Sequence, residues 1–362
     1  MKILFIAPRQ HTNYSGIINT LKKKNNIFFN SIYKSKNEDY TFVKPKILKQ
    51  NLLSKFIIFF LGKKVLKFYY FPKILDYYKY IKKINPDLVF LRITGRFNFY
   101  LNLIFLSLFN CKIICHEQKL NNRRYLKNTN IKNFFLYLEF CLLKLIFNIR
   151  LFSPIYNKQD EDFYYLPFVT HKKINKISRN NKSDFISIGK FEKRKNFIFL
   201  ISALKKLNFK FSLLIIGENT SKNHKRYLMN LKKYIKKNNL QKRIKIKTNI
   251  PFNKIDYFLK KKGLFILPSY SEPASISLLE SISAGVPVIC SDSCGTKIHI
   301  RENLNGFIFK TNNEISLLNK INIYLSSKKK FNYYSKNCYE YSRINLSSVN
   351  FDYYFKKILK SY

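Results

Sequence analysis

The chain has 362 residues, a length typical of two domains or of one large one. Its 68 Lys and Arg against 20 Asp and Glu give a formal net charge of +48, yet 46% of the residues are hydrophobic and 17% aromatic. This apolar content excludes a disordered basic protein, and nine Gly with ten Pro exclude a fibrous or linker-rich one.

In the first half of the chain, apolar runs predict strands at Lys2–Ala7, Leu88–Leu91 and Lys112–Cys115, with helices between them. The run at residues 1–7 is too short for a signal peptide, and no segment is predicted to span a membrane. Phe134–Phe152 is the most hydrophobic stretch, but the charges inside it favour an amphipathic helix. These charges are Glu139, Lys144 and Arg150.

Residues Leu52–Phe71 contain an apolar run, 56–61, with lysines on both sides. This pattern suits a helix that lies on an anionic membrane surface. A partly buried helix with a solvated lysine face fits the same pattern equally well.

The second half starts a new alternation of strands and helices, which indicates parallel α/β architecture. Five strands within about 110 residues predict a second Rossmann-like domain. The predicted strands are Phe185–Gly189, Phe211–Gly217, Ile244–Lys247, Leu264–Leu267 and Val286–Cys290. The predicted helices are Phe197–Lys206, Arg226–Asn238, Ile255–Lys262 and Ser275–Ala284.

We therefore expect an N-terminal domain at residues 1–168, a C-terminal domain at 169–348 and a final aromatic amphipathic helix at 349–362. The charge is spread over both halves, +20 in residues 1–168 and +28 in 169–362. An even basic surface favours anionic partners such as membrane headgroups, nucleic acid or phosphorylated substrates. Codon bias in an AT-rich genome is a competing explanation for the lysines.

The six cysteines are too few and too scattered for a disulfide scaffold. Three residues separate Cys111 from Cys115 and Cys290 from Cys294, whereas zinc sites favour shorter, repeated spacing with histidine nearby. We expect buried thiols in a reducing cytoplasm and no metal site. Asp160-Glu161-Asp162 is a D-x-D pattern, but its polar surroundings favour a solvated loop over a metal site.

The densest candidate site follows the predicted strand Leu264–Leu267. Glu272 lies in the loop after it, Ser275 can cap the next helix, and Glu280 lies on that helix. The backbone N–H groups at the helix N-terminus, at Ser275 and Ile276, form a natural seat for a pyrophosphate. A carboxylate at Glu280 can accept two hydrogen bonds from the adjacent hydroxyls of a ribose.

Two glutamates separated by seven residues, with Glu-Pro first and Ala-Gly-x-Pro-Val after them, resemble the donor site of GT-B glycosyltransferases of the large retaining family 4. This resemblance implies two Rossmann-like, doubly wound domains that face a cleft. It covers residues 180–310 in detail and 1–170 only in outline. Asn305-Gly306-Phe307 also resembles a later element of the family, whereas Ile298 stands where the family often has an acid.

Residues Gly189, Lys190 and Lys195 resemble the family's element of a strand, a glycine and two cations. Lys190 replaces the usual arginine, so it offers a point charge instead of a planar fork. By resemblance, both lysines would neutralise the diphosphate of the donor. In a chain with 68 basic residues, only their position after Gly189 gives them this meaning.

The N-terminal half matches the family weakly. Its usual Gly-Gly loop is represented only by Ser15-Gly16, where Gly16 would bring the backbone near the donor. His116, at the end of a predicted strand, resembles the family histidine that contacts the transferred sugar. A structural role for a lone histidine at a strand end is the alternative.

Together these patterns predict a glycosyltransferase of the hexosyltransferase type that transfers sugar from a nucleotide-sugar substrate, with retention and without a metal or other cofactor. Catalytic roles are expected for Glu272, His116 and Lys195, and donor binding for Gly16, Gly189, Lys190, Lys195, Ser275, Ile276 and Glu280. The expected acceptor is a glycan or a lipid-linked glycan of a bacterial surface polysaccharide or lipopolysaccharide. We expect a cytoplasmic enzyme, peripheral on the inner face of the plasma membrane, that docks on anionic lipid and binds no nucleic acid. A sugar-nucleotide epimerase of the same fold and a basic nucleic-acid-binding protein are the alternatives.

Overall fold

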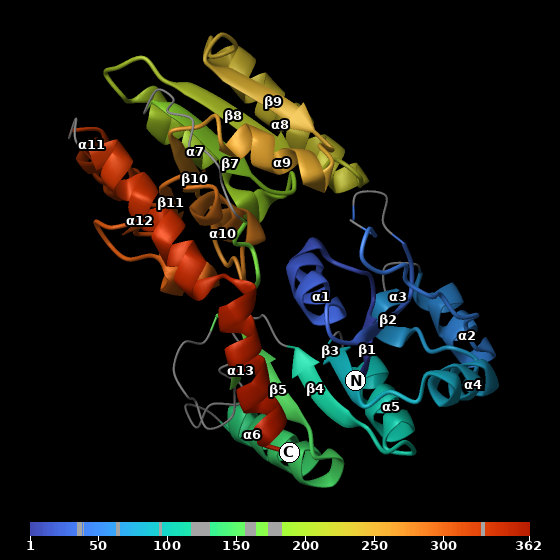
Figure 1. Cartoon of the computed structure of the whole chain (residues 1–362). Coiled ribbons are helices and arrows are strands. Elements are labelled where there is room, and N and C mark those ends of the chain that lie inside the picture. Colours follow the sequence, from blue (N-terminus) through green and yellow to red (C-terminus); the bar gives the residue numbers. More distant parts are fainter. Residues whose placement is uncertain are drawn as a thin grey trace. The chain divides into compact units, whose positions relative to one another are not determined.

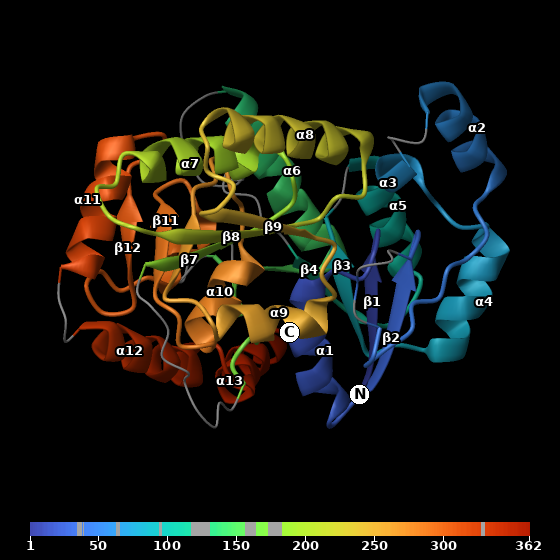
Figure 2. The ribbon, with the colours of Figure 1, turned by 90° about the horizontal axis from the view of Figure 1, so that it is seen from above.

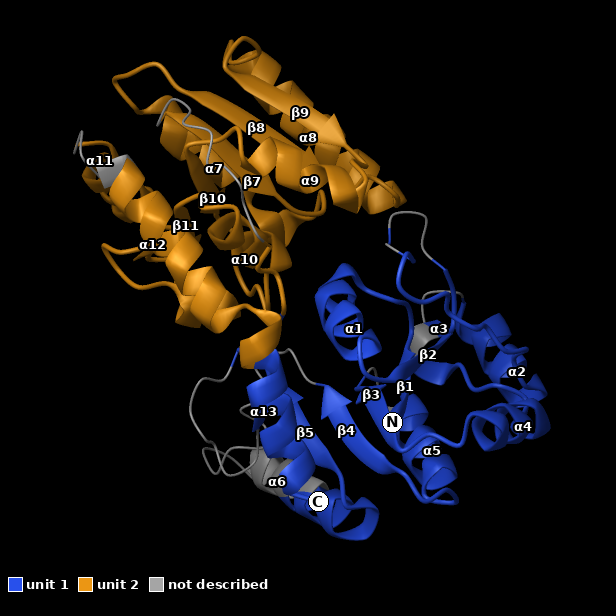
Figure 3. Cartoon of the chain, viewed as in Figure 1, with its two compact units in different colours: residues 1–168, 351–362 blue, residues 169–350 orange. Residues whose placement is uncertain are grey.

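The computed structural model describes residues 1–34, 38, 40–62, 66–93, 96–116, 131–155, 164–172, 183–326 and 330–362. The chain forms two compact units, coloured separately in Figure 3. Unit 1 comprises residues 1–168 and 351–362, and unit 2 comprises residues 169–350. Each unit is built on a parallel six-stranded sheet and is described by itself.

The sheet of unit 1 has the strand order β2-β1-β3-β4-β5-β6, and all its pairs are parallel. Its strands are β1 (Lys2–Ala7), β2 (Asn26–Ser31), β3 (Leu88–Arg92), β4 (Lys112–His116), β5 (Arg150–Ser153) and β6 (Tyr164–Tyr165). Its helices are α1 (Ser15–Lys22), α2 (Leu52–Leu61), α3 (Leu66–Tyr69), α4 (Ile74–Ile84), α5 (Arg96–Leu106) and α6 (Ile131–Phe147), with a 3-10 turn η1 (Thr12–Tyr14) (Figure 1).

The three strands predicted in this half are confirmed as β1, β3 and β4, whereas β2, β5 and β6 were not predicted. The predicted helix Phe134–Phe152 is wrong at its C-terminal end. Helix α6 ends at Phe147, Asn148 follows with a positive φ, and the chain then enters β5. Leu52–Phe71 forms two helices, because Gly62 ends α2 with φ +78°.

The last helix, α13 (Ser348–Lys360), starts in unit 2 and continues into unit 1. Its residues Phe351, Phe355 and Ile358 are buried. The ring of Phe355 stacks on Phe90 of β3, with 6.0 Å between the ring centroids. The C-terminal end is also held, since Ser361 Oγ accepts a hydrogen bond from Arg150 Nε at 3.1 Å. The final helix is therefore part of the packing of unit 1.

The sheet of unit 2 has the strand order β12-β11-β10-β7-β8-β9. Its strands are β7 (Asp184–Ile188), β8 (Ser212–Gly217), β9 (Ile244–Thr248), β10 (Leu264–Leu267), β11 (Val288–Ser291) and β12 (Gly306–Phe309). Its helices are α7 (Phe197–Lys205), α8 (Lys222–Lys237), α9 (Phe252–Leu259), α10 (Ile276–Ser283), α11 (Glu314–Leu325) and α12 (Lys330–Asn345), with 3-10 turns η4 (Lys193–Lys195) and η5 (Gly295–His299).

Unit 2 is doubly wound, as predicted, but it has a sixth strand, β12, that was not expected. Chain order runs outward from β7 to β9 on one side and from β10 to β12 on the other, so the order reverses between β7 and β10. Figure 2 shows α7 and α8 on one face of this sheet and α9 and α10 on the other. In parallel sheets of this kind, ligands bind outside the carboxyl ends of the strands at the point of reversal.

Alternate residues of the central strands of unit 2 form the core beneath the covering helices. Phe185 of β7 and Ile215 of β8 belong to one buried cluster with Leu200 of α7 and Leu231 of α8. Helices cover both faces of the sheet, so consecutive residues of β7 and β8 are buried (Figure 2). This burial explains why these strands are continuous apolar runs in the sequence. No helix in the described part of the chain is both long enough and apolar enough to cross a membrane.

Candidate active site

The candidate site lies in unit 2, in the loops that follow β7 and β10. These two strands are paired side by side, in register from Leu264 opposite Phe185. Gly189 and Lys190 follow the end of β7, and Glu272 lies in the loop that follows β10. Gly189, Lys190 and Glu272 are thereby brought to the point where the strand order reverses.

Lys195 is a buried cation, with only 6% of its surface exposed. The chain passes from β7 into η4, and Lys195 is the last residue of that turn. A Cβ atom at Gly189 would lie 2.9 Å from Cδ and Cε of Lys195. Glycine at position 189 therefore gives the lysine side chain room to cross the backbone.

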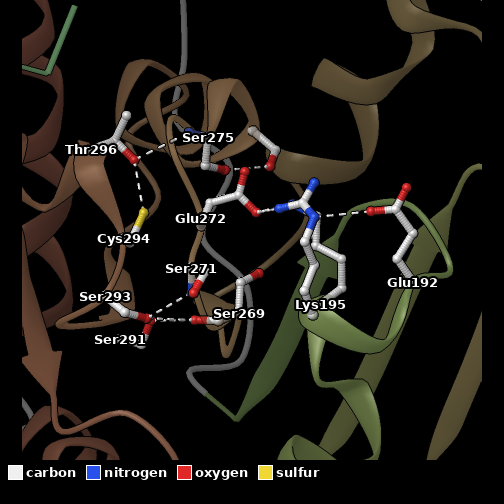
Figure 4. Close-up of polar contacts among 12 residues, drawn as sticks. Glu192, Lys195, Ser269, Ser271, Glu272, Ser275, Ser291, Ser293, Cys294 and Thr296 are labelled. Atoms are coloured by element: carbon white, nitrogen blue, oxygen red, sulfur yellow. Dashed lines mark hydrogen bonds and ion pairs between the residues drawn. The ribbon is translucent and has the colours of Figure 1, made fainter. Parts of the chain in front are cut away.

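Glu272 is 4% exposed and is held by two cations through a single carboxylate oxygen. Lys195 Nζ lies 2.5 Å from Glu272 Oε2, and both residues are labelled in Figure 4. Arg194 Nη1 lies 2.6 Å from the same oxygen. A buried carboxylate is stable only when it is paired and hydrogen-bonded, and this arrangement satisfies both conditions. Two residues predicted for catalysis, Lys195 and Glu272, are therefore in direct contact.

Backbone contacts fix the loop that presents Glu272. Ser271 has φ +51°, an uncommon value for a residue with a side chain, which turns the chain immediately before Glu272. The carbonyl of Glu272 accepts a hydrogen bond from Gly295 N at 2.9 Å. Tyr270 N donates to Arg194 O at 2.9 Å, so the loop after β10 is tied to the turn after β7.

Helix α10 begins beside this loop. Ser275 is its N-cap residue, and its Oγ accepts a hydrogen bond from Leu278 N at 3.3 Å. Ser275 N in turn donates to Thr296 Oγ1 at 3.4 Å. Ile276 is the first residue of the helix, so it lies at the positive end of the helix dipole, where an anion is stabilised.

A second set of charges surrounds the turn after β7. Lys190 Nζ pairs with Glu218 Oε2 at 3.4 Å, and Arg194 Nε donates to Glu192 Oε2 at 3.0 Å. His224, on α8, contacts the other carboxylate oxygen of Glu192 at 3.3 Å. Burial alone would raise the pKa of Glu192, but Arg194, Lys190 and hydrogen bonds from His224 and Arg194 lower it below its usual value.

Glu280 lies on α10 and is only partly exposed. Burial of its carboxyl raises its pKa to about 8, because the attraction of Lys172 is too weak to offset desolvation and Asp256 adds repulsion. At neutral pH the side chain is consequently protonated, and it can donate one hydrogen bond as well as accept others.

His116 and Gly16 belong to unit 1. His116 is 2% exposed, its Nδ1 lies 2.7 Å from Tyr14 Oη, and its ring stacks on Phe152. Burial and, to a smaller extent, Arg92 lower the pKa of His116 well below its usual value, so the imidazole is neutral. Ser15 and Gly16 lie in the first turn of α1 and not in a loop, which corrects the expectation for this segment.

Arg194 was missed by the analysis of the sequence. It stands between Lys193 and Lys195 in a run of three cations, and nothing local distinguishes the three. In the structure Lys193 is exposed, Lys195 is buried, and Arg194 bridges Glu192 and Glu272. Only the tertiary contacts separate these roles.

The alternative metal sites find no support among the described residues. The described ranges contain no group of three or more His, Cys, Asp or Glu side chains that could hold a metal ion. The D-x-D pattern Asp160-Glu161-Asp162 lies outside those ranges. All six cysteines are free thiols; Cys115, Cys290, Cys294 and Cys338 are buried, and Cys111 and Cys141 are half-buried.

Comparison with known proteins assigns the larger part of unit 2 to a family. Residues 170–341 match the family described as glycosyl transferases group 1. This range contains Gly189, Lys190, Lys195, Ser275, Ile276 and both glutamates of the candidate site.

Two curated proteins are similar over part of the chain. An uncharacterized glycosyltransferase, MJ1178 of Methanocaldococcus jannaschii, is 26% identical over 46% of this chain. The Escherichia coli UDP-Gal:alpha-D-GlcNAc-diphosphoundecaprenol alpha-1,3-galactosyltransferase is 27% identical over 53% of it. Each match covers 46% of the relative's own length, so the chain matches about half of either protein.

One solved structure extends the similarity to the whole chain. The Anabaena Alr3699/HepE protein, crystallised in complex with UDP-glucose, superposes with a TM-score of 0.75 over 100% of both chains at 13% identity. A likeness at this identity concerns the fold. Residues 170–341 thus match the glycosyl transferases group 1 family, and the chain as a whole has the GT-B fold.

Proposed function

We propose that this protein is a glycosyltransferase of the hexosyltransferase type that takes its sugar from a nucleotide-sugar donor. The contact of Lys195 with Glu272 beside the N-terminus of α10 carries this proposal. It supplies a cation and a helix dipole for a diphosphate, together with a carboxylate for sugar hydroxyls. The Anabaena relative's complex with UDP-glucose supports a donor of this class.

In the proposed reaction, the bond between the anomeric carbon and the diphosphate oxygen breaks, and an acceptor hydroxyl forms the new bond on the same face of the sugar. Negative charge develops on the diphosphate, and Lys190, Lys195 and the backbone N–H groups at Ser275–Ile276 stabilise it. The departing phosphate takes the proton of the acceptor. No metal ion is assigned a step.

The remaining site residues receive roles from the resemblance. Glu272 orients the transferred sugar, and Glu280 binds the ribose. Gly189 gives close approach to the donor, and the resemblance assigns His116 a hydrogen bond to the transferred sugar. A neutral imidazole at His116 is suited to hydrogen-bonding a sugar hydroxyl without adding charge.

We propose a glycan or a lipid-linked glycan of a bacterial surface polysaccharide or lipopolysaccharide as the acceptor. The E. coli relative is named for a diphosphoundecaprenol acceptor, which supports a lipid-linked substrate. Such an acceptor favours a cytoplasmic enzyme that is peripheral on the inner face of the plasma membrane. The basic surface is suited to anionic lipid there, with attraction that weakens as salt rises.

A thermal-shift panel of UDP-, GDP- and ADP-sugars tests the proposal. We expect one nucleotide class to raise the melting temperature of the wild type, and Glu280→Ala to weaken that shift. Lys190→Ala should do the same. Lys193→Ala serves as the matched control, because Lys193 lies in the same turn as Lys195 but is exposed. A wild type that none of the sugars stabilises contradicts the proposal.

Incubating the stabilising donor with and without candidate acceptors separates transfer from epimerisation. A transferase forms product only when an acceptor or water receives the sugar. Interconversion of the donor without an acceptor identifies an epimerase of the same fold and rejects the transferase assignment.

A further inference from the structure

Helix α2 of unit 1 carries its large apolar side chains on the outside. Leu52, Leu53, Phe56, Phe59 and Phe60 are exposed by 59–79%, and Ser54 is the one buried residue of the helix. Folded proteins rarely leave several large apolar side chains together in water. We call these five residues the α2 apolar face.

Polar contacts attach α2 to the rest of unit 1. The N-cap residue Asn51 accepts a hydrogen bond from Ser54 N, and Asn51 N donates to Phe71 O at 3.0 Å. Ser54 Oγ donates to Tyr69 O at 2.7 Å and accepts from Phe71 N at 2.8 Å. These contacts fix which side of the helix faces the protein, so the exposed phenylalanines are not the result of a detached segment.

The exposed side chains form one continuous face. Leu52, Phe56, Phe59 and Phe60 recur at helical spacing, so they lie on the same side of α2. The ring of Phe60 packs against Phe56 at 4.6 Å and against Phe59 at 5.4 Å. Helix α8 of unit 2 shows the usual opposite pattern, with Leu228, Leu231 and Ile235 buried and its lysines outside.

The segment of the chain that contains the α2 apolar face is rich in lysine. Residues 44–84 contain eleven lysines and a single acid, Asp76. Lys55 is exposed on α2 itself, and Lys79, Lys82 and Lys83 are exposed on α4, beside the exposed Ile74 and Leu75. Helices α2 and α4 lie at the same end of unit 1 (Figures 1 and 2).

This charge decides between two occupants of the face. A second copy of the chain would bring lysines against lysines in a protein of net charge +48. An anionic bilayer instead offers headgroups to the lysines and an apolar layer to the phenylalanines.

We propose that the α2 apolar face is the element by which unit 1 inserts into the surface of an anionic membrane. Its aromatic and leucine side chains enter the boundary between headgroups and acyl chains, while Lys55 and the lysines of α4 contact the headgroups. This proposal rests on the proposed function, whose lipid-linked acceptor is presented at such a surface. Membrane binding then depends on the insertion of apolar side chains as well as on the attraction between lysines and headgroups.

Flotation of the full chain with vesicles tests the assignment. The vesicles are phosphatidylcholine alone, or equal parts of phosphatidylcholine and phosphatidylglycerol, at low and at high salt. The test variant is Phe56→Ser/Phe59→Ser/Phe60→Ser. The matched control removes three exposed apolar side chains of unit 2, as Met229→Ser/Ile315→Ser/Ile344→Ser.

We expect the wild type and the control to float with the anionic vesicles, and the α2 variant to lose at least about tenfold in bound fraction. Lys55→Gln should weaken binding about fivefold at low salt and much less at high salt. Salt screens the attraction between the lysine and the headgroups, whereas it does not screen the insertion of the apolar side chains. An α2 variant that floats like the wild type overturns the proposal. So does a wild-type dimer that the α2 variant converts to a monomer, since the face would then be covered by a second copy.

The donor thermal shift, measured on the same proteins, separates the two proposals. An α2 variant that is still stabilised by donor is folded, and its loss of flotation then concerns docking alone. Wild-type protein that floats through α2 without any donor shift contradicts the proposed function and leaves the docking assignment standing. Wild-type protein that responds to donor but never floats overturns the docking assignment alone.

Discussion

Lys195 Nζ lies 2.5 Å from Glu272 Oε2, and both side chains are almost fully buried. In the proposed reaction, the first group neutralises the diphosphate and the second orients the sugar. The two groups also neutralise one another, and Arg194 adds a second cation to the same oxygen. Arg194 therefore keeps Glu272 paired independently of Lys195.

Lys195→Ala should lower kcat by about 100-fold, because it removes one cation that stabilises the developing charge. The same substitution should lower the free energy of unfolding by only ~1–3 kcal/mol. This is less than the cost of leaving a buried carboxylate without any cation, because Arg194 still pairs with Glu272. Steady-state kinetics and denaturant unfolding measure the two effects. Lys193→Ala, in the same turn but exposed, should change neither. Wild-type turnover in Lys195→Ala contradicts the catalytic assignment.

Glu280 should make the protein less stable as pH rises. Its pKa of about 8 in the folded state lies above the usual value of a glutamate, so the folded state binds a proton that the unfolded state has already lost. Stability from this group is complete at acid pH and falls between about pH 4.5 and 8 by roughly 4 kcal/mol. Lys172 and Asp256 are the charges that act on it.

Glu280→Gln removes that titration. We expect its unfolding free energy to depend less on pH over this range than that of the wild type, measured by urea unfolding at several pH values. Equal pH slopes for the two proteins would show that Glu280 is ionised in the folded state.

His116 should act in the opposite direction. Its folded-state pKa lies well below the usual value, so the unfolded state takes up a proton first as the solution is acidified. The contribution to stability is complete above about pH 6.5 and is lost as pH falls below it. His116→Phe can keep the stacking on Phe152 and should weaken this acid sensitivity in thermal unfolding. An unchanged acid profile would contradict a buried, neutral histidine.

Phe355 should be a structural residue of unit 1 although it lies seven residues from the end of the chain. Phe355→Ala removes a buried ring that stacks on Phe90, and it should cost about 3–5 kcal/mol. Tyr353→Ala, at a position on the same helix that is 63% exposed, should change stability by less than about 0.5 kcal/mol. Denaturant unfolding compares them. Equal stability of both variants would show that α13 does not pack on unit 1.

Most of unit 2 could be predicted from the sequence, and the five predicted strands correspond to β7–β11. Four of them, β7, β8, β10 and β11, are largely buried, so each appears as a short apolar run, whereas β9 alternates isoleucine with lysine. The positions of Glu272, Glu280 and Lys195 could be found because they follow such strand ends at set distances along the chain. These are local patterns, and a linear sequence displays local patterns directly.

Features that depend on distant contacts became visible only in the folded chain. Strand β2 has an apolar run of only three residues, 27–29, between Asn26 and Asn30, and it is a strand because β1 pairs with it along its full length. Arg194 is one of three consecutive cations until Glu272, 78 residues away, selects it. The phenylalanines of α2 looked like core residues or a membrane face until Ser54 and Asn51 set the side of the helix that faces the protein. In each case, the contact that fixes the feature joins residues that are not neighbours in the sequence, so no short stretch of sequence reveals it.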